Sequence, residues 1–154
     1  MNVMPTDCLF CRIAAGATPA AIVFEDQHSL AFLDHRPLFP GHCLLVPKAH
    51  YETLAEVPPD FVGPLFSTAQ LLCAAVEQGL AAEGSFVAVN NRISQSVPHV
   101  HIHVVPRRRG DGLRGFFWPR QKYRDEAHIE QTCAAVRNTM ERLVQSPKDV
   151  RFET

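Results

Sequence analysis

Three histidines alternate with aliphatic residues along one short segment of the chain, residues 99–104. Successive side chains of a β-strand point to opposite faces, so His99, His101 and His103 are expected to share one face of a strand. The aliphatic residues between them would occupy the other face, which is typical of a packed core. The segment therefore requires a sheet that buries one face and carries three imidazoles on the other.

Five short runs of β-prone residues, at 22–24, 30–33, 43–46, 86–89 and 100–105, predict five strands. Apolar residues that recur every three or four positions predict a long helix from Pro58 to Leu80, closed near Gly84. The same spacing predicts a second helix from near Asp125 to Val144. Because the strands do not alternate regularly with helices, we expect an α+β fold built on an antiparallel sheet.

The composition is that of one soluble domain. The chain has 154 residues, of which 46% are hydrophobic, and we expect a single domain over 1–154 with its core at about 8–144 and a short tail from Pro147. A formal charge of −1 excludes binding to nucleic acid or membrane through bulk electrostatics. The start of the chain lacks the pattern of a leader, and no apolar run approaches the ~20 residues that span a bilayer. We expect a cytoplasmic protein with no membrane partner and no specific nucleic-acid partner.

The row of histidines is compatible with two kinds of chemistry. In one, His99 and His101 are both ligands of a catalytic zinc ion. All three histidines are not expected to bind one ion, because His99 and His103 would lie about 13 Å apart at ~3.3 Å per residue. In the other, one histidine is a nucleophile that attacks phosphorus, while its neighbours and backbone carbonyls fix its tautomer.

Cys8 and Cys11 have the spacing of half a tetrahedral zinc site. The histidines that are candidates to complete it are His28, His35, His42, His50, His99 and His128. If His50 and His99 are the other two ligands, zinc has four protein ligands and no open position, so it would be structural and would leave His101 free. The alternative is that both cysteines are reduced thiols on a short helix.

The segment 99–105 resembles the signature of the histidine-triad family of nucleotide hydrolases and transferases. Segments 8–13, 31–34, 40–50 and 95–97 also resemble blocks of that family, in the family's order. The resemblance covers about 8–106. It implies a histidine-triad (HIT)-like fold, a homodimer and an enzyme acting on nucleotides. Zinc-containing bacterial members are similar in the two cysteines and His50.

The resemblance also implies a role for each matching residue. His101 would be the nucleophile that forms a nucleotidyl-histidine intermediate, and His99 and His103 would orient it or contact the phosphates. Asp34 would bind the ribose hydroxyls; the alternative is that it is a turn residue before Pro37. The remaining substrate contacts would come from His42, Phe32, Asn90, Gln95 and Ser96. Two departures from the family pattern leave the base preference open: the loop 90–95 is short and lacks glycine, and His35 stands where aliphatic residues are common.

Positive charge gathers after the histidines. Between Val105 and Arg124, seven basic residues stand against Asp111 alone. The run 106–111 is similar to the branch that cleaves dinucleoside polyphosphates, the fragile-histidine-triad proteins, so Arg107 is expected to contact the departing part of such a substrate. A solvated loop is the alternative. The aromatic residues at 116–118 are expected to pack in the core or at a dimer contact rather than to stack on substrate.

We therefore expect a hydrolase or transferase that attacks the α-phosphate of a nucleoside polyphosphate, a dinucleoside polyphosphate or a nucleoside phosphoramidate. The expected cofactor is structural zinc, bound by Cys8, Cys11, His50 and His99. Magnesium would enter only with a polyphosphate substrate, because no carboxylate cluster is typical of a magnesium site. The alternatives are a zinc-dependent hydrolase that uses the strand histidines as ligands, and a nucleotide-binding module without catalysis.

Overall fold

A computed structural model of the chain describes residues 7–113 and 121–146. The chain divides into two compact units, Met1–Asp111 and Gly112–Thr154. The expectation that both form one domain stays a prediction. The segment 116–118 and the tail from Pro147 lie outside the described residues.

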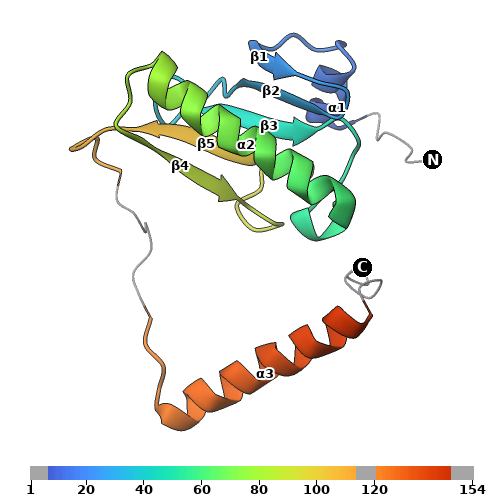
Figure 1. The fold of residues 1–154 in the computed structure, drawn as a ribbon, viewed down its shortest axis with the longest axis vertical. Coiled ribbons are helices and arrows are strands. Elements are labelled where there is room, and N and C mark those ends of the chain that lie inside the picture. The colour runs from blue at the N-terminus through green and yellow to red at the C-terminus, as the bar shows by residue number, and fades with distance from the viewer. Residues whose placement is uncertain (1–6, 114–120, 147–154) are drawn as a thin grey trace. The chain divides into compact units, whose positions relative to one another are not determined.

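The first unit is built on a five-stranded antiparallel sheet of order β1-β2-β3-β5-β4 (Figure 1). The strands are β1 (Ile22–Glu25), β2 (Ser29–Leu33), β3 (Cys43–Pro47), β4 (Gly84–Val89) and β5 (Ile102–Arg107). The first two strands form a hairpin, and Asp26 closes its turn by accepting hydrogen bonds from the backbone N–H groups of His28 and Ser29. The predicted α+β fold is confirmed.

One face of the sheet is covered by the long helix α2 (Pro59–Gly79), which Figure 1 shows lying across the strands. The helix begins with a proline at its first position, where the missing N–H costs no hydrogen bond. Its buried residues Leu65, Ala69, Leu72 and Val76 pack with residues of β3 and β5. The helix ends at Gly79 rather than near Gly84, because Ala81 turns the chain with a φ of 49° and Gly84 opens β4.

The opposite face of the sheet carries the short helix α1 (Leu9–Ala14). Phe10, Cys11 and Ile13 on this helix pack with Phe32 of β2 and Leu44 of β3. Leu44 belongs to this cluster while its neighbour Leu45 belongs to the α2 cluster, because successive strand residues point to opposite faces. The α1 face also receives the histidine segment, so it is the face where a site is expected.

The described helix of the second unit is α3 (Glu126–Gln145). Asp125 caps its start, since the carboxylate accepts a hydrogen bond from the backbone N–H of His128 at 2.7 Å. The predicted C-terminal helix is therefore confirmed. No helix within 7–113 or 121–146 is long and apolar enough to cross a membrane.

Candidate active site and metal centre

The histidine segment keeps the predicted alternation but only partly as a strand. Strand β5 begins at Ile102, so His99 and His101 precede it. The backbone N–H of Val100 donates to the Tyr51 carbonyl at 2.7 Å, and that of His99 donates to the Val97 carbonyl, so these two groups are not used in sheet pairing. Val100 and Ile102 are nevertheless fully buried. The expected start of the strand at Val100 was wrong, while the expected facing of the side chains is confirmed.

His99 joins Cys8, Cys11 and His50 in a compact group of ligand atoms, all within 4.8 Å of one another. The His99 Nδ1 atom lies 3.5 Å from each cysteine Sγ and 3.3 Å from His50 Nδ1, and Cys11 Sγ lies 3.3 Å from His50 Nδ1. Zinc bonds of ~2.3 Å to sulfur and ~2.1 Å to nitrogen at tetrahedral angles require about 3.6 Å between a sulfur and a nitrogen ligand and about 3.4 Å between two nitrogen ligands. The four residues therefore fit a tetrahedral zinc ion.

The tautomer of His99 also suits a metal. Its Nε2 lies 2.8 Å from the carbonyl oxygen of Pro47, which can only accept, so Nε2 carries the proton and donates it. The Nδ1 lone pair is then directed at the cysteines. Burial lowers the pKa of His99 to about 4, which keeps the ring neutral. Burial, followed by the neighbouring Cys8, raises the pKa of the Cys11 thiol to about 12, so thiolate formation here needs a positive charge such as a metal ion.

His101 uses its other nitrogen in the equivalent way. Its Nδ1 lies 2.7 Å from the backbone carbonyl oxygen of His99, so Nδ1 carries the proton and Nε2 keeps its lone pair. The side chain is buried, and burial lowers its pKa, which keeps the imidazole neutral. A neutral imidazole with an unprotonated Nε2 has the form that a nucleophile requires.

His42 and His103 form a hydrogen-bonded pair, and a backbone N–H group determines which nitrogen of each ring carries the proton. The N–H of Leu38 donates to His42 Nδ1 at 3.1 Å, so the proton of His42 is on Nε2. That Nε2 donates to His103 Nδ1 at 2.9 Å, which leaves the proton of His103 on its own Nε2. Burial lowers the pKa of both rings, that of His103 to about 4. His103 therefore presents a neutral N–H donor, and its ring centre lies 4.8 Å from that of His101.

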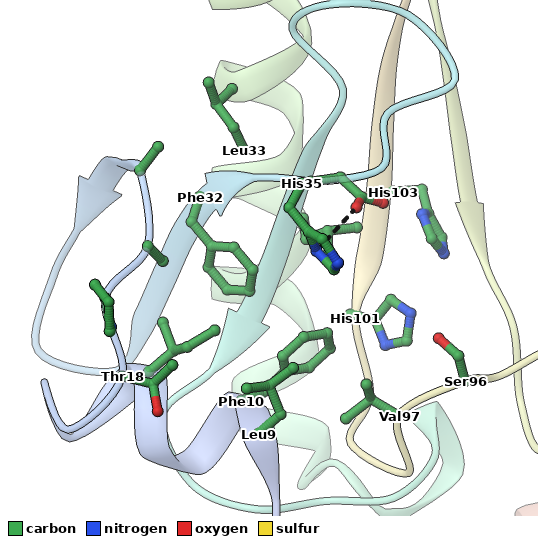
Figure 2. A pocket seen from close by; sticks show the side chains of 16 residues that line it. Leu9, Phe10, Thr18, Phe32, Leu33, His35, Ser96, Val97, His101 and His103 are labelled. Atoms are coloured by element: carbon green, nitrogen blue, oxygen red, sulfur yellow. Dashed lines mark ion pairs between the residues drawn. The ribbon is translucent and has the colours of Figure 1, made fainter.

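His101 and His103 border a cavity of about 610 Å³ on the α1 face (Figure 2). Its apolar lining includes Leu9, Phe10, Ile13, Phe32, Leu44 and Val97. Its polar lining includes Asp34, His35, Ser96, His101 and His103. The Phe10 ring connects the two parts, with its centre 5.4 Å from that of Phe32 and 5.1 Å from that of His101. A cavity with one aromatic end and one polar end suits an amphipathic ligand.

Asp34 and Ser96 line this cavity as expected. The Asp34 side chain is partly buried, and its Oδ1 accepts a hydrogen bond from the backbone N–H of Arg36 at 2.9 Å, which fixes the carboxylate. Asn90 and Gln95 are not part of the lining. Gln95 donates to the Glu52 carbonyl and accepts from the N–H of Arg92, and Asn90 donates to the Ser94 carbonyl. Both therefore brace the 90–95 loop here, and their expected substrate contacts stay predictions.

Arg107 lies outside the cavity lining and is engaged within the chain. Its Nε donates to one oxygen of Asp111 at 2.6 Å and its terminal nitrogen donates to the other at 3.0 Å. Arg108 donates to the carbonyls of Leu80 and Ala81, just after α2. The start of the basic run thus holds local structure together, and the expected contact between Arg107 and substrate stays a prediction.

Asp34, His42 and His103 form a second group whose ligand atoms lie within 4.8 Å of one another. The hydrogen bonds weaken it as a metal site, since both nitrogens of His42 are engaged, by Leu38 and by His103. Among the described residues, two groups are compact enough to hold an ion, and His101 belongs to neither. The arrangement therefore does not support a zinc hydrolase in which His99 and His101 share one metal.

Sequence reasoning missed Phe10, Ile13 and Val97 as cavity residues. The sequence does hold a signal for Phe10 and Ile13. If Cys8 and Cys11 belong to a short helix, Phe10 and Ile13 belong to it too, and residues three apart lie on one face of a helix. It also missed the carbonyl of Pro47 and the N–H of Leu38. Backbone groups carry no residue-type signal, so only the folded chain could reveal them.

A family model described as the HIT domain matches residues 15–110. The Arabidopsis thaliana protein "Adenylylsulfatase HINT3" is 37% identical over 73% of this chain, a match that spans 58% of its own length. The Saccharomyces cerevisiae protein "Adenosine 5'-monophosphoramidase HNT1" is 33% identical over 75% of this chain and 72% of its own. The crystal structure of a zinc-bound histidine triad family protein from Mycobacterium smegmatis is similar with a TM-score of 0.67 and 37% identity, over 84% of this chain and 97% of that one.

Proposed function

Since the chain belongs to the HIT domain family, we propose that it hydrolyses or transfers nucleotides at the α-phosphate, with His101 as the nucleophile. The observation that carries this proposal is the hydrogen bond from His101 Nδ1 to the His99 carbonyl. It leaves the Nε2 lone pair of a neutral, buried imidazole at the edge of a cavity. Related proteins named as an adenylylsulfatase and a phosphoramidase support a nucleotide hydrolase or transferase.

The reaction has two steps that balance. In the first, Nε2 of His101 attacks the α-phosphorus, a nitrogen–phosphorus bond forms, and the bond to the leaving group breaks as that group takes up a proton. In the second, water attacks the same phosphorus and gives up a proton, which balances the one that the leaving group took up; the nitrogen–phosphorus bond breaks and the nucleoside monophosphate leaves. An acceptor other than water would make the reaction a transfer.

The neighbouring polar groups stabilise the charge that develops on the phosphate. The N–H at His103 Nε2 is a donor whose orientation is fixed through His42 and Leu38, so it needs no rearrangement during the reaction. Ser96 adds a hydroxyl in the same lining. We assign to His103 and Ser96 the binding of non-bridging phosphate oxygens.

The rest of the cavity suits a nucleoside. A carboxylate such as Asp34 accepts hydrogen bonds from a vicinal diol, and this one is held in place by the N–H of Arg36. The aromatic end, formed by Phe10 and Phe32, suits the face of a base. Because Arg107 is paired with Asp111 in the described structure, we favour a short leaving group over a second nucleoside.

Zinc at Cys8, Cys11, His50 and His99 would be structural in this scheme. With four protein ligands it has no open position for substrate. It would tie α1 to the segment before β5, and so hold the His99 carbonyl against His101. We also propose a homodimer, as the family resemblance implies.

The proposed function is tested by trapping the covalent intermediate. The protein is mixed with adenosine 5'-phosphosulfate or with adenosine 5'-phosphoramidate, quenched in acid-free denaturant during turnover, and examined by intact-mass and peptide mass spectrometry. We expect one adenylyl group on the peptide that contains His101, and none in His101→Asn. The control His128→Ala, which changes a partly exposed histidine of α3, should keep the adduct. Turnover without an adduct on His101 would contradict the proposal.

A further inference from the structure

The turn at residues 38–42 sets the proton positions of His42 and His103, because the Leu38 N–H donates to His42 Nδ1 at 3.1 Å. This turn is in contact with Leu80, the residue that follows α2. We propose that Leu80 is a positioning residue for the reaction, which holds the turn and thereby fixes the His42–His103 pair. This inference rests on the proposed function, in which His103 donates to a phosphate oxygen.

Gly41 makes the contact between the turn and Leu80. Its φ is +97°, a conformation that glycine adopts without strain. A Cβ atom at residue 41 would overlap the Cδ1 methyl group of Leu80 and would lie 3.3 Å from Cγ of Pro106. The Leu80 methyl group therefore occupies the space in which a side chain would begin. The next residue is His42, whose N–H closes the turn by donating to the Phe39 carbonyl at 3.0 Å.

The backbone of Leu80 is fixed on both sides. Its N–H donates to the Val76 carbonyl at 3.2 Å, and its carbonyl accepts a hydrogen bond from a terminal nitrogen of Arg108. The same guanidinium donates to the Ala81 carbonyl at 2.6 Å. Arg108 directly follows β5, and Figure 1 shows the end of α2 near the end of that strand. These hydrogen bonds keep Leu80 against Gly41.

Leu80 is exposed for a residue with so close a contact. Its exposed fraction is 43%, and it borders a hollow of about 330 Å³. The other residues of that lining are Phe39, Pro40, Pro106, Arg108 and Asp111. Truncation of Leu80 would extend the hollow to Gly41 and give the turn room to move. Because an exposed leucine contributes little to folding, this effect can be separated from a loss of stability.

Movement of the turn would change which atoms carry protons in the site. If the Leu38 N–H leaves His42 Nδ1, that nitrogen can carry the proton of the ring, and His42 Nε2 then accepts from His103 Nδ1. His103 Nε2 would lose its proton and become an acceptor. It could no longer donate to a phosphate oxygen, so the stabilisation of the developing charge would be lost in that tautomer.

The test is Leu80→Ala with two readouts. NMR of the histidine ring nitrogens at neutral pH shows which nitrogen of His42 and His103 carries the proton. We expect Nε2 in both rings of the parent protein and a mixture of tautomers in the variant. With adenosine 5'-phosphoramidate as substrate, kcat should fall about tenfold while KM changes less than about twofold. Leu80→Met, whose terminal methyl group can reach Gly41, should restore both readouts.

Leu71→Ala is the matched control. It truncates another leucine of α2, which is 69% exposed and borders Val23 and Phe24 of β1 instead. It should keep the ring-nitrogen spectrum and the kcat of the parent protein.

Three results would overturn the positioning role of Leu80. They are an unchanged ring-nitrogen spectrum in Leu80→Ala, an altered spectrum with a kcat at the parent level, and an equal loss of kcat in Leu71→Ala. Absence of turnover in the parent protein would instead refute the proposed function. The ring-nitrogen spectrum would still decide whether Leu80 holds the turn, since it requires no substrate.

Discussion

His99 and His101 are two residues apart and both are buried, yet they expose opposite nitrogens. The Nε2–H group of His99 donates a hydrogen bond to the Pro47 carbonyl, and Nδ1 faces two cysteines. The Nδ1–H group of His101 donates a hydrogen bond to the His99 carbonyl, which leaves the Nε2 lone pair available at the cavity. In each case one backbone acceptor selects the tautomer. The tautomer of His99 thereby suits metal binding, and that of His101 suits nucleophilic chemistry.

The largest expected effect comes from removing the nucleophile. His101→Asn should lower kcat by about four orders of magnitude, because the remaining donors bind phosphate but cannot attack it. Zinc content and the thermal midpoint should stay close to those of the parent protein. Steady-state kinetics and elemental analysis check both halves of this expectation. Turnover that remains at the parent level would remove His101 from the chemistry, and loss of zinc would show that the two histidines are not separable.

The metal side of the comparison is tested at Cys11. Cys11→Ser should abolish stoichiometric zinc and lower the free energy of unfolding by roughly 3–5 kcal/mol. That is less than the ~10 kcal/mol or more of zinc-finger peptides, because this unit also has apolar clusters on both faces of its sheet. Cys133→Ser, which changes an exposed cysteine of α3, is the matched control and should keep its zinc. Protein that is carefully purified and still lacks zinc, or that links Cys8 to Cys11 by a disulfide, would refute the assignment.

The hydrogen-bonded pair His42–His103 should make the stability of the protein depend on pH. Burial holds the pKa of His103 at about 4, whereas an unfolded histidine has a pKa near 6.5. Between these values the unfolded state binds more protons, so stability is full above about pH 6.5 and falls as the pH drops towards 4. One such group contributes up to ~1.4 kcal/mol per pH unit. Urea unfolding from pH 7 to pH 4.5 should therefore show a shallower decline for His103→Gln than for the parent protein. Identical slopes would exclude this contribution.

The smallest expected effect concerns Arg107. If it leaves Asp111 to contact a long leaving group, Arg107→Ala should raise KM for a dinucleoside polyphosphate two- to fivefold, the range of an exposed ion pair. KM for a nucleoside phosphoramidate should not change, and added salt should reduce the difference. Asp111→Ala, which removes the carboxylate that pairs with Arg107, should lower KM for the polyphosphate. Equal effects on both substrates would leave Arg107 with the structural role that its pairing describes.

Patterns of residue type predicted much of the fold and of the site. The alternation at 99–104 placed the imidazoles on one face, and the Cys8–Cys11 spacing together with His50 and His99 named the residues that do assemble. Boundaries were less accurate. The expected end of α2 near Gly84 was wrong by five residues, because the turn at Ala81 and the start of β4 depend on contacts that helical periodicity does not contain.

The partners of the polar side chains were harder to predict from the sequence. Gln95 is expected to contact the substrate, and in the structure its amide donates to the backbone carbonyl of Glu52, 43 residues away, so the substrate contact stays a prediction. Arg107 was expected at the substrate, and its partner Asp111 lies only four residues along. In both cases the chemical type of the side chain is compatible with several hydrogen-bond partners. The choice among them depends on distances that exist only once the chain has folded.

The sequence by itself determined which side chains are candidates for the chemistry: the three alternating histidines, the paired cysteines and the carboxylate at Asp34. The tertiary structure decided which nitrogen of each histidine is available. Pro47 and Leu38 set that choice through a backbone carbonyl and a backbone N–H, groups that every residue of their kind possesses. Their effect arises from placement alone, since a hydrogen bond forms only when folding brings donor and acceptor within about 3 Å.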